Sequence, residues 1–500
     1  MRPALSLGRI VEVLRARGLL EEVRGTEDVA VLGVTQDSRS VRPGDLFLAW
    51  RGATVDAHDF VAHAAGRGAS AAVVERPLDL DLPQVIVVDG RLAGALAADV
   101  VLGSPGRSLV LVGVTGTNGK TTTALLLRSL LQARWPAAAL GTLGVVGPDG
   151  RVRPGTEGLT TPGPVQLVRW LRDLADEGVE AVTLEASSHA LEQRRMDALS
   201  FRAGVFTNLG SDHLDYHADA GTYRSAKLRL LDLLGDGGFA VVNADDPAWA
   251  DLPAGTRTLT YGIDAAEVDL RAENVTLTAE GATFDLAVGG TGAMGGTGAR
   301  RAPVALPLLG RFNVENALAA AGAAIALGLD LDDVARNLAR APAVPGRLEV
   351  VTRDPVTVVI DFAHTPDALE RVLSTLRPLV AGRLVVVFGA GGDRDRTKRR
   401  PMAEAVARHA DVILLTSDNP RTEDPEAILD DLEEGLRGRV HERVADRRRA
   451  IGRALELAGE GDLVLLAGKG HETYQLVGGE RRPFDERVVV AELLAGRGAA

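Results

Sequence analysis

The amino-acid sequence predicts an α/β protein with three domains. Its 500 residues exceed the roughly 250–300 residues at which a single hydrophobic core stops growing. Two segments rich in glycine and proline, 102–106 and 341–346, divide the chain, and short apolar runs alternate with helical patterns after each of them. Such alternation is typical of a parallel sheet with crossover helices. We therefore expect domains at 1–106, 107–341 and 342–500.

The composition favours a soluble globular protein in a reducing, cytoplasmic setting. The 56 basic and 68 acidic residues give a net charge of −12, which argues against general binding to nucleic acid or to an anionic membrane. No run of 18 or more apolar residues occurs, so we expect no transmembrane helix. Cysteine is absent, which excludes disulfides, zinc–thiolate sites, iron–sulfur clusters and cysteine nucleophiles.

Segment 1–106 mixes short helical and strand patterns. Near its start, four apolar residues at helical spacing alternate with charged residues: Leu7, Ile10, Val11 and Leu14. This pattern predicts an amphipathic helix and not the apolar core of a signal peptide. The stretch TQDSRSVRPGDLF at 35–47 predicts a polar turn that enters an apolar strand.

Segment 107–341 alternates strand and helix patterns. We expect strands at 108–114, 181–185 and 202–207, and helices at 120–132, 164–177, 219–234 and 313–328. The region 270–310 is richer in β pattern and contains GGTGAMGGTGARR. Gly290–Gly295 matches G-x-G-x-x-G literally, but more glycines and Pro303 follow where a dinucleotide site needs a helix. We therefore interpret it as a surface loop.

The alternation restarts in segment 342–500. Apolar runs there predict four strands of a second parallel or mixed sheet, at 356–361, 384–389, 411–416 and 462–468.

The strongest local signal is VGVTGTNGKTT at 112–122, between an apolar strand and a helix. Glycines allow backbone N–H groups to close around phosphates, and the helix N-terminus adds favourable partial charge. Lys120 can reach the β- and γ-phosphates of a nucleotide, and Thr121 can offer its hydroxyl to Mg²⁺. The loop is a variant, because Val114 stands where the strict P-loop has glycine.

This variant loop resembles that of the Mur ligase family, whose members extend the peptide of bacterial cell-wall precursors. Further family motifs follow in order along nearly the whole chain: LEASSHAL, FTNLGSDHLDYH, GRFNVENALAA, PGRLE and DFAHTPDAL. Within the family the MurE type is most similar, on TQDSRSVRPGDLF, TTPGPVQL, EASSHALEQRR, GGDRDRTKR, SDNPRTEDP and AGKGHETYQ. The resemblance implies an N-terminal UDP-substrate domain, a central P-loop-type ATPase domain and a C-terminal Rossmann-like domain for the incoming amino acid.

The resemblance also implies the nucleotide and metal residues. ATP would contact Gly116, Thr117, Asn118, Gly119, Lys120, Thr121, Thr122, Asn313, Asn316, Arg347 and Asp361. Mg²⁺ would be held by Thr121, Glu185, His213 and a carbamate formed from Lys227 and CO₂. Lys120, Lys227 and His213 would be the catalytic residues. From the residues alone, Lys227 would be a solvated helical lysine and His213 a structural histidine.

Two further groups of residues would bind the other substrates. The UDP-MurNAc-L-Ala-D-Glu contacts would be Ser38, Thr160, Thr161, Ser187, Gln193 and Arg195. The contacts to meso-2,6-diaminopimelate would be Arg394, Asp418, Asn419, Pro420, Arg421, Gly468 and Glu472. Arg421 and Arg394 can each pair with a carboxylate through two N–H groups, and Glu472 can accept from a distal ammonium.

The implied reaction is the ATP-dependent formation of an amide. ATP phosphorylates the γ-carboxylate of D-Glu, and the amine of diaminopimelate then attacks the acyl phosphate to give the amide, ADP and phosphate. The nearest alternative is a ligase of the same type that adds lysine or ornithine. The full set of UDP-substrate motifs argues against folate polyglutamylation, and the intact nucleotide and metal residues argue against a catalytically silent nucleotide-binding scaffold. We expect a monomer.

Overall fold

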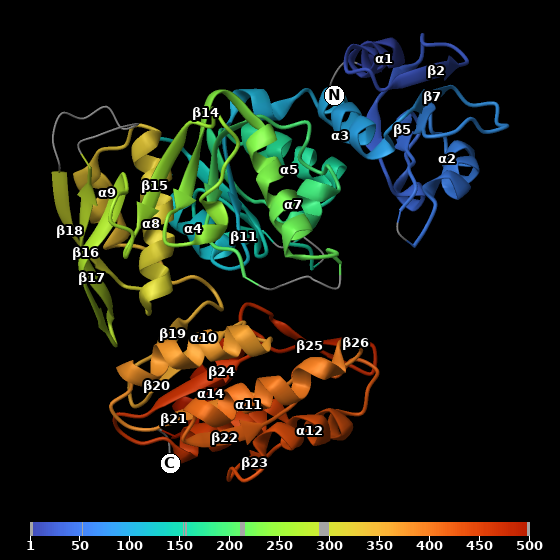
Figure 1. Ribbon diagram of the computed structural model, residues 1–500. Helices are drawn as coiled ribbons and strands as arrows, with labels where there is room; N and C mark the ends of the chain where they lie inside the picture. Colours follow the sequence, from blue (N-terminus) through green and yellow to red (C-terminus); the bar gives the residue numbers. More distant parts are fainter. Residues whose placement is uncertain are drawn as a thin grey trace. The chain divides into compact units, whose positions relative to one another are not determined.

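The structure is a computed structural model that describes residues 4–52, 54–153, 155, 158–210, 216–289 and 300–497. The chain forms two compact units (Figure 1). The first unit comprises Met1–Ala272, Leu286–Ala302 and Glu315–Asn337, and the second comprises Glu273–Asp285, Pro303–Val314 and Leu338–Ala500. The domain ranges expected from the sequence stay a prediction. No helix in the described part of the chain is long and apolar enough to cross a membrane.

The first unit begins with a five-stranded sheet in the order β2-β7-β6-β5-β4, parallel except for β2. Its strands are β2 (Leu20–Arg24), β4 (Gly33–Thr35), β5 (Asp45–Leu48), β6 (Ala71–Val74) and β7 (Gln84–Val87), and β1 (Leu5–Ser6) pairs with β3 (Ala30–Val31). The helices are α1 (Leu7–Ala16), α2 (Val61–Gly66) and α3 (Gly90–Val101). The predicted amphipathic helix is confirmed, because all four of its apolar residues are buried. The predicted turn-to-strand stretch is also confirmed, as a 3₁₀ turn (Ser38–Ser40) followed by β5.

An eleven-stranded sheet follows, in the order β11-β10-β9-β12-β8-β13-β14-β15-β16-β17-β18. The run from β9 to β16 is parallel, whereas β10 and β11 pair antiparallel. The strands are β8 (Val110–Thr115), β9 (Ala137–Gly141), β10 (Gly144–Val146), β11 (Val152–Arg153), β12 (Ala181–Glu185), β13 (Phe201–Phe206), β14 (Leu234–Asn243), β15 (Thr258–Gly262), β16 (Leu270–Thr278), β17 (Gly281–Val288) and β18 (Arg300–Leu306). The helices are α4 (Lys120–Leu131), α5 (Pro164–Asp176), α6 (Ser188–Glu192), α7 (Ala220–Asp232), α8 (Arg311–Ala326) and α9 (Leu331–Leu338).

The predicted strands and helices of this region are confirmed to within about two residues. The first strand starts at Val110 and not at 108, because Pro105–Ser108 forms a 3₁₀ turn that ends only at Ser108. The β-rich pattern at 270–310 corresponds to β16, β17 and β18. The interpretation of Gly290–Gly295 as a loop falls on residues 290–299, which lie outside the described residues.

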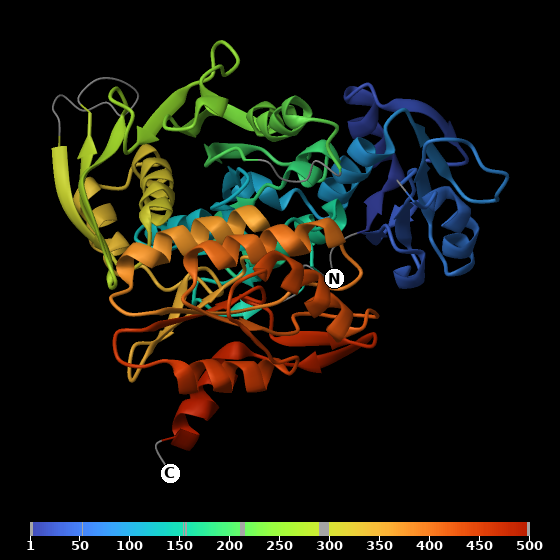
Figure 2. The same ribbon diagram turned by 60° about the horizontal axis from the view of Figure 1, so that its bottom comes forward.

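The part of the second unit from residue 338 onward, coloured orange to red in Figure 2, contains a six-stranded sheet. Its strand order is β19-β20-β24-β21-β22-β23, and all neighbours are parallel except for β19. The strands are β19 (Glu349–Thr352), β20 (Thr357–Asp361), β21 (Leu384–Phe388), β22 (Val412–Leu415), β23 (Glu442–Arg443) and β24 (Leu463–Ala467). The helices are α10 (Pro366–Leu376), α11 (Arg399–His409), α12 (Pro425–Glu433), α13 (Arg447–Leu457) and α14 (Glu486–Arg497). Alternate residues of the central strands enter two separate cores, one on each face, which confirms the predicted mixed sheet and explains its continuous apolar runs.

A hairpin of β25 (Tyr474–Val477) and β26 (Glu480–Pro483) completes this unit. Its two-residue turn is Gly478-Gly479, with φ of +58° and +83°. Two adjacent residues at positive φ match the right-handed twist of a hairpin, which is why glycine is suited to both positions. The sequence analysis did not predict this hairpin.

Candidate functional site

The phosphate loop lies between β8 and α4 and passes close to two side chains. Gly116 has a φ of +146° and Gly119 a φ of +85°. A Cβ atom on Gly116 would lie 1.9 Å from Thr207 Oγ1, and one on Gly119 would lie 2.2 Å from Asn316 Oδ1. Both positions therefore require glycine for space as well as for backbone conformation. Asn316 also accepts from Thr123 Oγ1 at 3.3 Å.

Two lysines converge on one carbonyl oxygen of this loop. Lys120 Nζ donates to Gly116 O at 2.9 Å and to Thr117 O at 2.8 Å, and Lys227 Nζ donates to Gly116 O at 2.7 Å. Lys227 is only 1% exposed and lies 4.2 Å from the centre of the Tyr223 ring. The expectation from the residues alone, that Lys227 is a solvated helical lysine, is therefore wrong. Helices α4 and α7 together place two ammonium groups at the same carbonyl oxygen of this loop.

A carboxylate lies beside the first turn of α4. Thr121 Oγ1 donates to Glu185 Oε2 at 2.9 Å, and Thr142 donates to the same carboxylate through its N–H (2.8 Å) and its hydroxyl (3.1 Å). Glu185 ends β12, where ligands gather in parallel sheets, and is 3% exposed. A hydroxyl and a carboxylate are hard oxygen donors of the kind that Mg²⁺ prefers. A third proposed ligand, His213, lies outside the described residues. The sequence analysis missed Thr142.

Five of the six proposed UDP-substrate residues, all except Ser38, form one hydrogen-bonded group around the end of β12. Thr161 Oγ1 donates to Glu185 O at 2.6 Å and accepts from Ser187 N at 3.2 Å. Arg195 donates to Thr161 O at 2.6 Å and to Gln193 Oε1 at 2.7 and 3.1 Å. Burial lowers the pKa of Arg195. Thr160 accepts from Thr142 at 3.4 Å, and Ser38 is buried in the 3₁₀ turn after β4.

The second unit holds the remaining proposed nucleotide residues. Asp361 ends β20 and accepts from the backbone N–H groups of Leu348 (2.7 Å) and Ala363 (2.8 Å). Burial raises the pKa of Asp361, and the nearby Arg347 opposes that shift. The Arg347 guanidinium lies 5.0 Å from the centre of the Phe362 ring. Asn313 donates its amide to Leu309 O at 2.8 Å.

The ring of His471 packs against the ring of Phe362. The His471 ring lies 4.9 Å from the Phe362 ring, and within the described part of the chain its buried Nδ1 has no hydrogen-bond partner. Burial, together with the charges of Arg347 and Arg487, lowers the pKa of His471 to about 4. The imidazole is therefore neutral at physiological pH.

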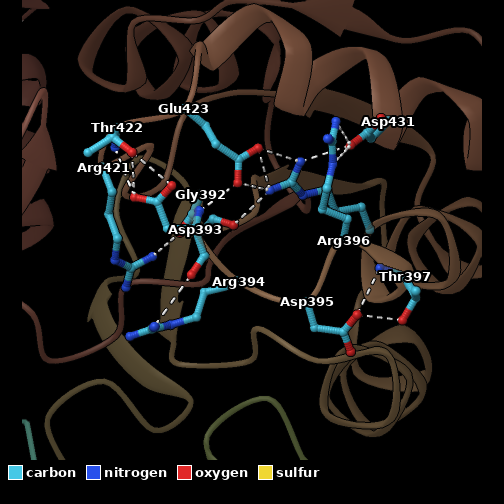
Figure 3. Close-up of polar contacts among 12 residues, drawn as sticks. Gly392, Asp393, Arg394, Asp395, Arg396, Thr397, Arg421, Thr422, Glu423 and Asp431 are labelled. Carbon is cyan, nitrogen blue, oxygen red and sulfur yellow. Dashed lines mark hydrogen bonds and ion pairs between the residues drawn. The ribbon is translucent and has the colours of Figure 1, made fainter.

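Two guanidinium groups of the second unit lie at one loop (Figure 3). Arg421 donates to Gly392 O at 2.6 Å, and Arg394 contacts Asp393 O at 3.5 Å. A Cβ atom on Gly391 would lie 2.9 Å from the Arg421 guanidinium and 3.7 Å from Arg394 Cγ, so the two arginines are neighbours. Both can pair with a carboxylate.

An ion-pair network centred on the buried Arg399 fixes this loop. Thr422 donates to both carboxylate oxygens of Asp393 at 2.9 Å, and Asp393 N donates to Glu423 Oε1 (Figure 3). Arg399, which is 1% exposed, donates to Glu423 at 2.9–3.0 Å and to Asp431 at 2.8 Å. The network joins the loop after β21 to the loop after β22. The sequence analysis quoted the GGDRDRTKR motif but missed this role of Arg399.

The remaining amino-acid residues lie at the ends of β22 and β24. Asn419 Nδ2 donates to Glu472 Oε2 at 2.8 Å. Gly468 has a φ of +115°, and a Cβ atom there would lie 2.3 Å from Asp418 Oδ2. Pro420 O accepts from Glu423 N at 3.1 Å. The second unit thus brings two guanidinium groups and one carboxylate to the carboxyl ends of its strands, where ligands of open parallel sheets bind.

The fold defines the chain as an α/β protein that has a glycine-rich loop between a buried parallel strand and a helix. Three family models match in order: the "Mur ligase family, catalytic domain" over residues 30–100, the "Mur ligase middle domain" over 114–324 and the "Mur ligase, glutamate ligase domain" over 346–470. The chain belongs to the Mur ligase family.

Several proteins that are similar to this chain carry the same enzyme name. A UDP-N-acetylmuramoyl-L-alanyl-D-glutamate–2,6-diaminopimelate ligase from Geobacillus kaustophilus is 43% identical over 485 residues, which cover 95% of this chain and 96% of that protein. Its namesake from Gloeobacter violaceus is 42% identical over 496 residues, 98% of each chain. A solved structure of a ligase with this name is 35% identical, covers 99% of both chains and has a TM-score of 0.69.

Proposed function

We propose that the chain is an ATP-dependent ligase that joins meso-2,6-diaminopimelate to the D-Glu γ-carboxylate of UDP-MurNAc-L-Ala-D-Glu. The observation that carries this proposal is the charge pattern of the second unit. Arg394, on the loop after β21, and Arg421, on the loop after β22, are neighbours, and Glu472 follows the adjoining strand β24. Diaminopimelate has a distal carboxylate beside its distal ammonium, whereas lysine and ornithine have only the ammonium. The names of the relatives agree with this choice.

The first chemical step would occur at the phosphate loop. A carboxylate oxygen of D-Glu attacks the γ-phosphorus of ATP, the bond to the β,γ-bridging oxygen breaks, and ADP leaves. Lys120 would exchange its bonds to Gly116 O and Thr117 O for phosphate oxygens and so neutralise the transferred group. Thr161, Ser187, Gln193 and Arg195 would hold the substrate so that the attack is in line.

The residues around the loop would also hold the metal and a modified lysine. Mg²⁺ would neutralise charge on the phosphates, held by Thr121, Glu185, His213 and Lys227 as its carbamate. Reaction of the neutral Lys227 amine with CO₂ gives the carbamate and releases a proton, which converts a cation into an anionic oxygen ligand. The burial of Lys227 and its contact with Gly116 O support this role, because they place the end of its side chain at the phosphate loop.

The second step forms the amide. The amine of diaminopimelate attacks the acyl carbon, the tetrahedral intermediate expels phosphate, and the amine loses a proton. Arg421 and Arg394 would bind the distal carboxylate and Glu472 the distal ammonium, while Asp418, Asn419, Pro420 and Gly468 would shape the pocket around them. Asp361, Arg347 and Asn313 would contact the nucleotide from the second unit.

Phosphate release tests this function. We expect release only when ATP, UDP-MurNAc-L-Ala-D-Glu and meso-diaminopimelate are all present, with one phosphate formed for each amide. Equal or faster release with lysine or ornithine in place of diaminopimelate would contradict the proposed substrate. Release that needs neither amino acid nor UDP-substrate would contradict the ligase reaction itself.

A further inference from the structure

Lys469 is a fully buried lysine at the carboxyl end of β24, between two proposed amino-acid contacts. Its exposed fraction is 0%. Its ammonium donates to Glu472 Oε2 at 3.1 Å and to Asn419 Oδ1 at 3.2 Å. A buried ammonium is tolerated only when it is paired and hydrogen-bonded. The structure therefore couples the charge of Lys469 to that of Glu472.

Lys469 also fixes the orientation of the Asn419 amide. Asn419 Oδ1 accepts from Lys469 Nζ and from Leu476 N at 2.9 Å. Because both of these groups are donors only, the oxygen of the amide must face them, and the NH₂ group then faces Glu472. The Asn419 amide and the Lys469 ammonium thus both donate to Oε2 of Glu472, which leaves Oε1 outside this pairing.

A second buried ion pair holds the same two strand ends together. Arg447 and Glu486 are both 0% exposed and are joined at 2.8 Å. Arg447 also donates to Ala467 O at 2.9 Å and to Ser417 O at 3.5 Å, the residues just before Gly468 and Asp418. The loops that carry Asn419 and Glu472 therefore have a second anchor besides Lys469. A change at Lys469 should accordingly act on the Glu472 carboxylate and leave the loops in place.

We propose that Lys469 is a positioning residue for amino-acid selection: together with Asn419 it holds Oε2 of Glu472, so that the carboxylate presents Oε1 to the distal ammonium of the incoming amino acid. The proposal rests on the function proposed above. Lys469 has no role of its own in the transfer of phosphate. Its loss should therefore raise KM for the amino acid and leave the binding of ATP and of the UDP-substrate unchanged.

The test is a double-mutant cycle on Lys469 and Glu472, read as KM for each of the three substrates. We expect Lys469→Met to raise KM for meso-diaminopimelate at least tenfold and to change KM for ATP and for the UDP-substrate less than twofold. Lys398→Met, at an exposed lysine of the same unit, is the matched control and should leave all three values unchanged. In a Glu472→Gln background, adding Lys469→Met should change KM for diaminopimelate less than threefold, because the carboxylate on which it acts is gone.

Three results would overturn the role of Lys469. They are an unchanged KM for diaminopimelate in Lys469→Met, an equal rise in all three KM values, and a tenfold or larger effect of Lys469→Met in the Glu472→Gln background. If Lys469→Met alone does not fold, the comparison of the double variant with Glu472→Gln still decides, because the double variant contains no unpaired buried charge at this site. Absence of wild-type turnover with diaminopimelate would instead refute the proposed function, and this role with it.

Discussion

Replacement of Arg421 by alanine tests the proposal that this arginine binds the distal carboxylate of meso-diaminopimelate. In the structure Arg421 is half-buried, and its guanidinium donates to Gly392 O at 2.6 Å. Removal of one partner of a desolvated charge pair costs roughly 2–5 kcal/mol. Since Arg421 is only half-buried, we expect the lower end, about 2 kcal/mol, or about a 30-fold loss of kcat/KM for meso-diaminopimelate.

Backbone strain at position 421 should be the same in the wild-type protein and in Arg421→Ala. Arg421 has a φ of +54°, and alanine carries the same Cβ atom as arginine, so both residues bear the cost of the left-handed conformation. The lost bond to Gly392 O should lower the free energy of unfolding by only about 1 kcal/mol. Arg437→Ala, at an exposed arginine of the same unit, is the control.

The assay is turnover at saturating ATP and UDP-substrate while each amino acid is titrated. The wild-type enzyme should discriminate strongly against lysine, because Arg421 would be left desolvated and unpaired. The variant should lose that discrimination mainly by losing diaminopimelate. If Arg421→Ala lowers kcat/KM equally for both amino acids, the reasoning is refuted, and Arg421 supports the loop while Arg394 reads the carboxylate.

Three further perturbations test other parts of the site. Lys120→Ala should lower kcat by about 10²-fold or more, because a cation at the transferred phosphoryl group is lost; turnover within about threefold of wild type, in a variant folded by circular dichroism, would rule out that role. Lys227→Ala should be nearly inactive, and short carboxylic acids should partly restore its turnover because they supply the missing anion. Lys227→Arg should be inactive. Equal activity of Lys227→Arg and wild type would show that a cation suffices. The pKa of His471 is about 4 in the folded protein, against 6.5 for an ordinary histidine. Between these two pH values the unfolded chain therefore binds more protons than the folded protein. The free energy of unfolding should fall as the pH drops from 6.5 towards 4, by up to about 3 kcal/mol. Urea unfolding of wild type and His471→Gln at pH 7 and pH 4.5 checks this, and an acid loss of the same size in both would contradict it.

Local patterns in the sequence predicted the scaffold of the site well. The apolar strand, glycine loop and helix around Lys120 follow from neighbouring residues, and the observed bounds differ from the predicted ones by at most two residues. The family resemblance implied that Thr121 and Glu185 hold the same Mg²⁺, and the two side chains do meet. Their role in holding a metal stays a prediction.

Contacts between distant segments could not be predicted in the same way. Lys227 lies 111 residues from Gly116 in the chain, and its apolar helical neighbours gave no sign that its ammonium would be buried. Lys469 follows the apolar strand LVLLA and was quoted only as part of a motif. A lysine two residues after a buried strand is a usable signal of a buried cation, but its partners, Asn419 and Glu472, come together only through the fold.

The central claim is that this chain forms the amide of meso-diaminopimelate with the UDP-dipeptide. The most direct measurement is a competition: enzyme, ATP and UDP-MurNAc-L-Ala-D-Glu with equal concentrations of meso-diaminopimelate, lysine and ornithine, the products being resolved by mass spectrometry. The product should be almost entirely the diaminopimelate amide, in an amount that equals the phosphate released. A product dominated by lysine or ornithine, or phosphate release without any amide, would contradict the account.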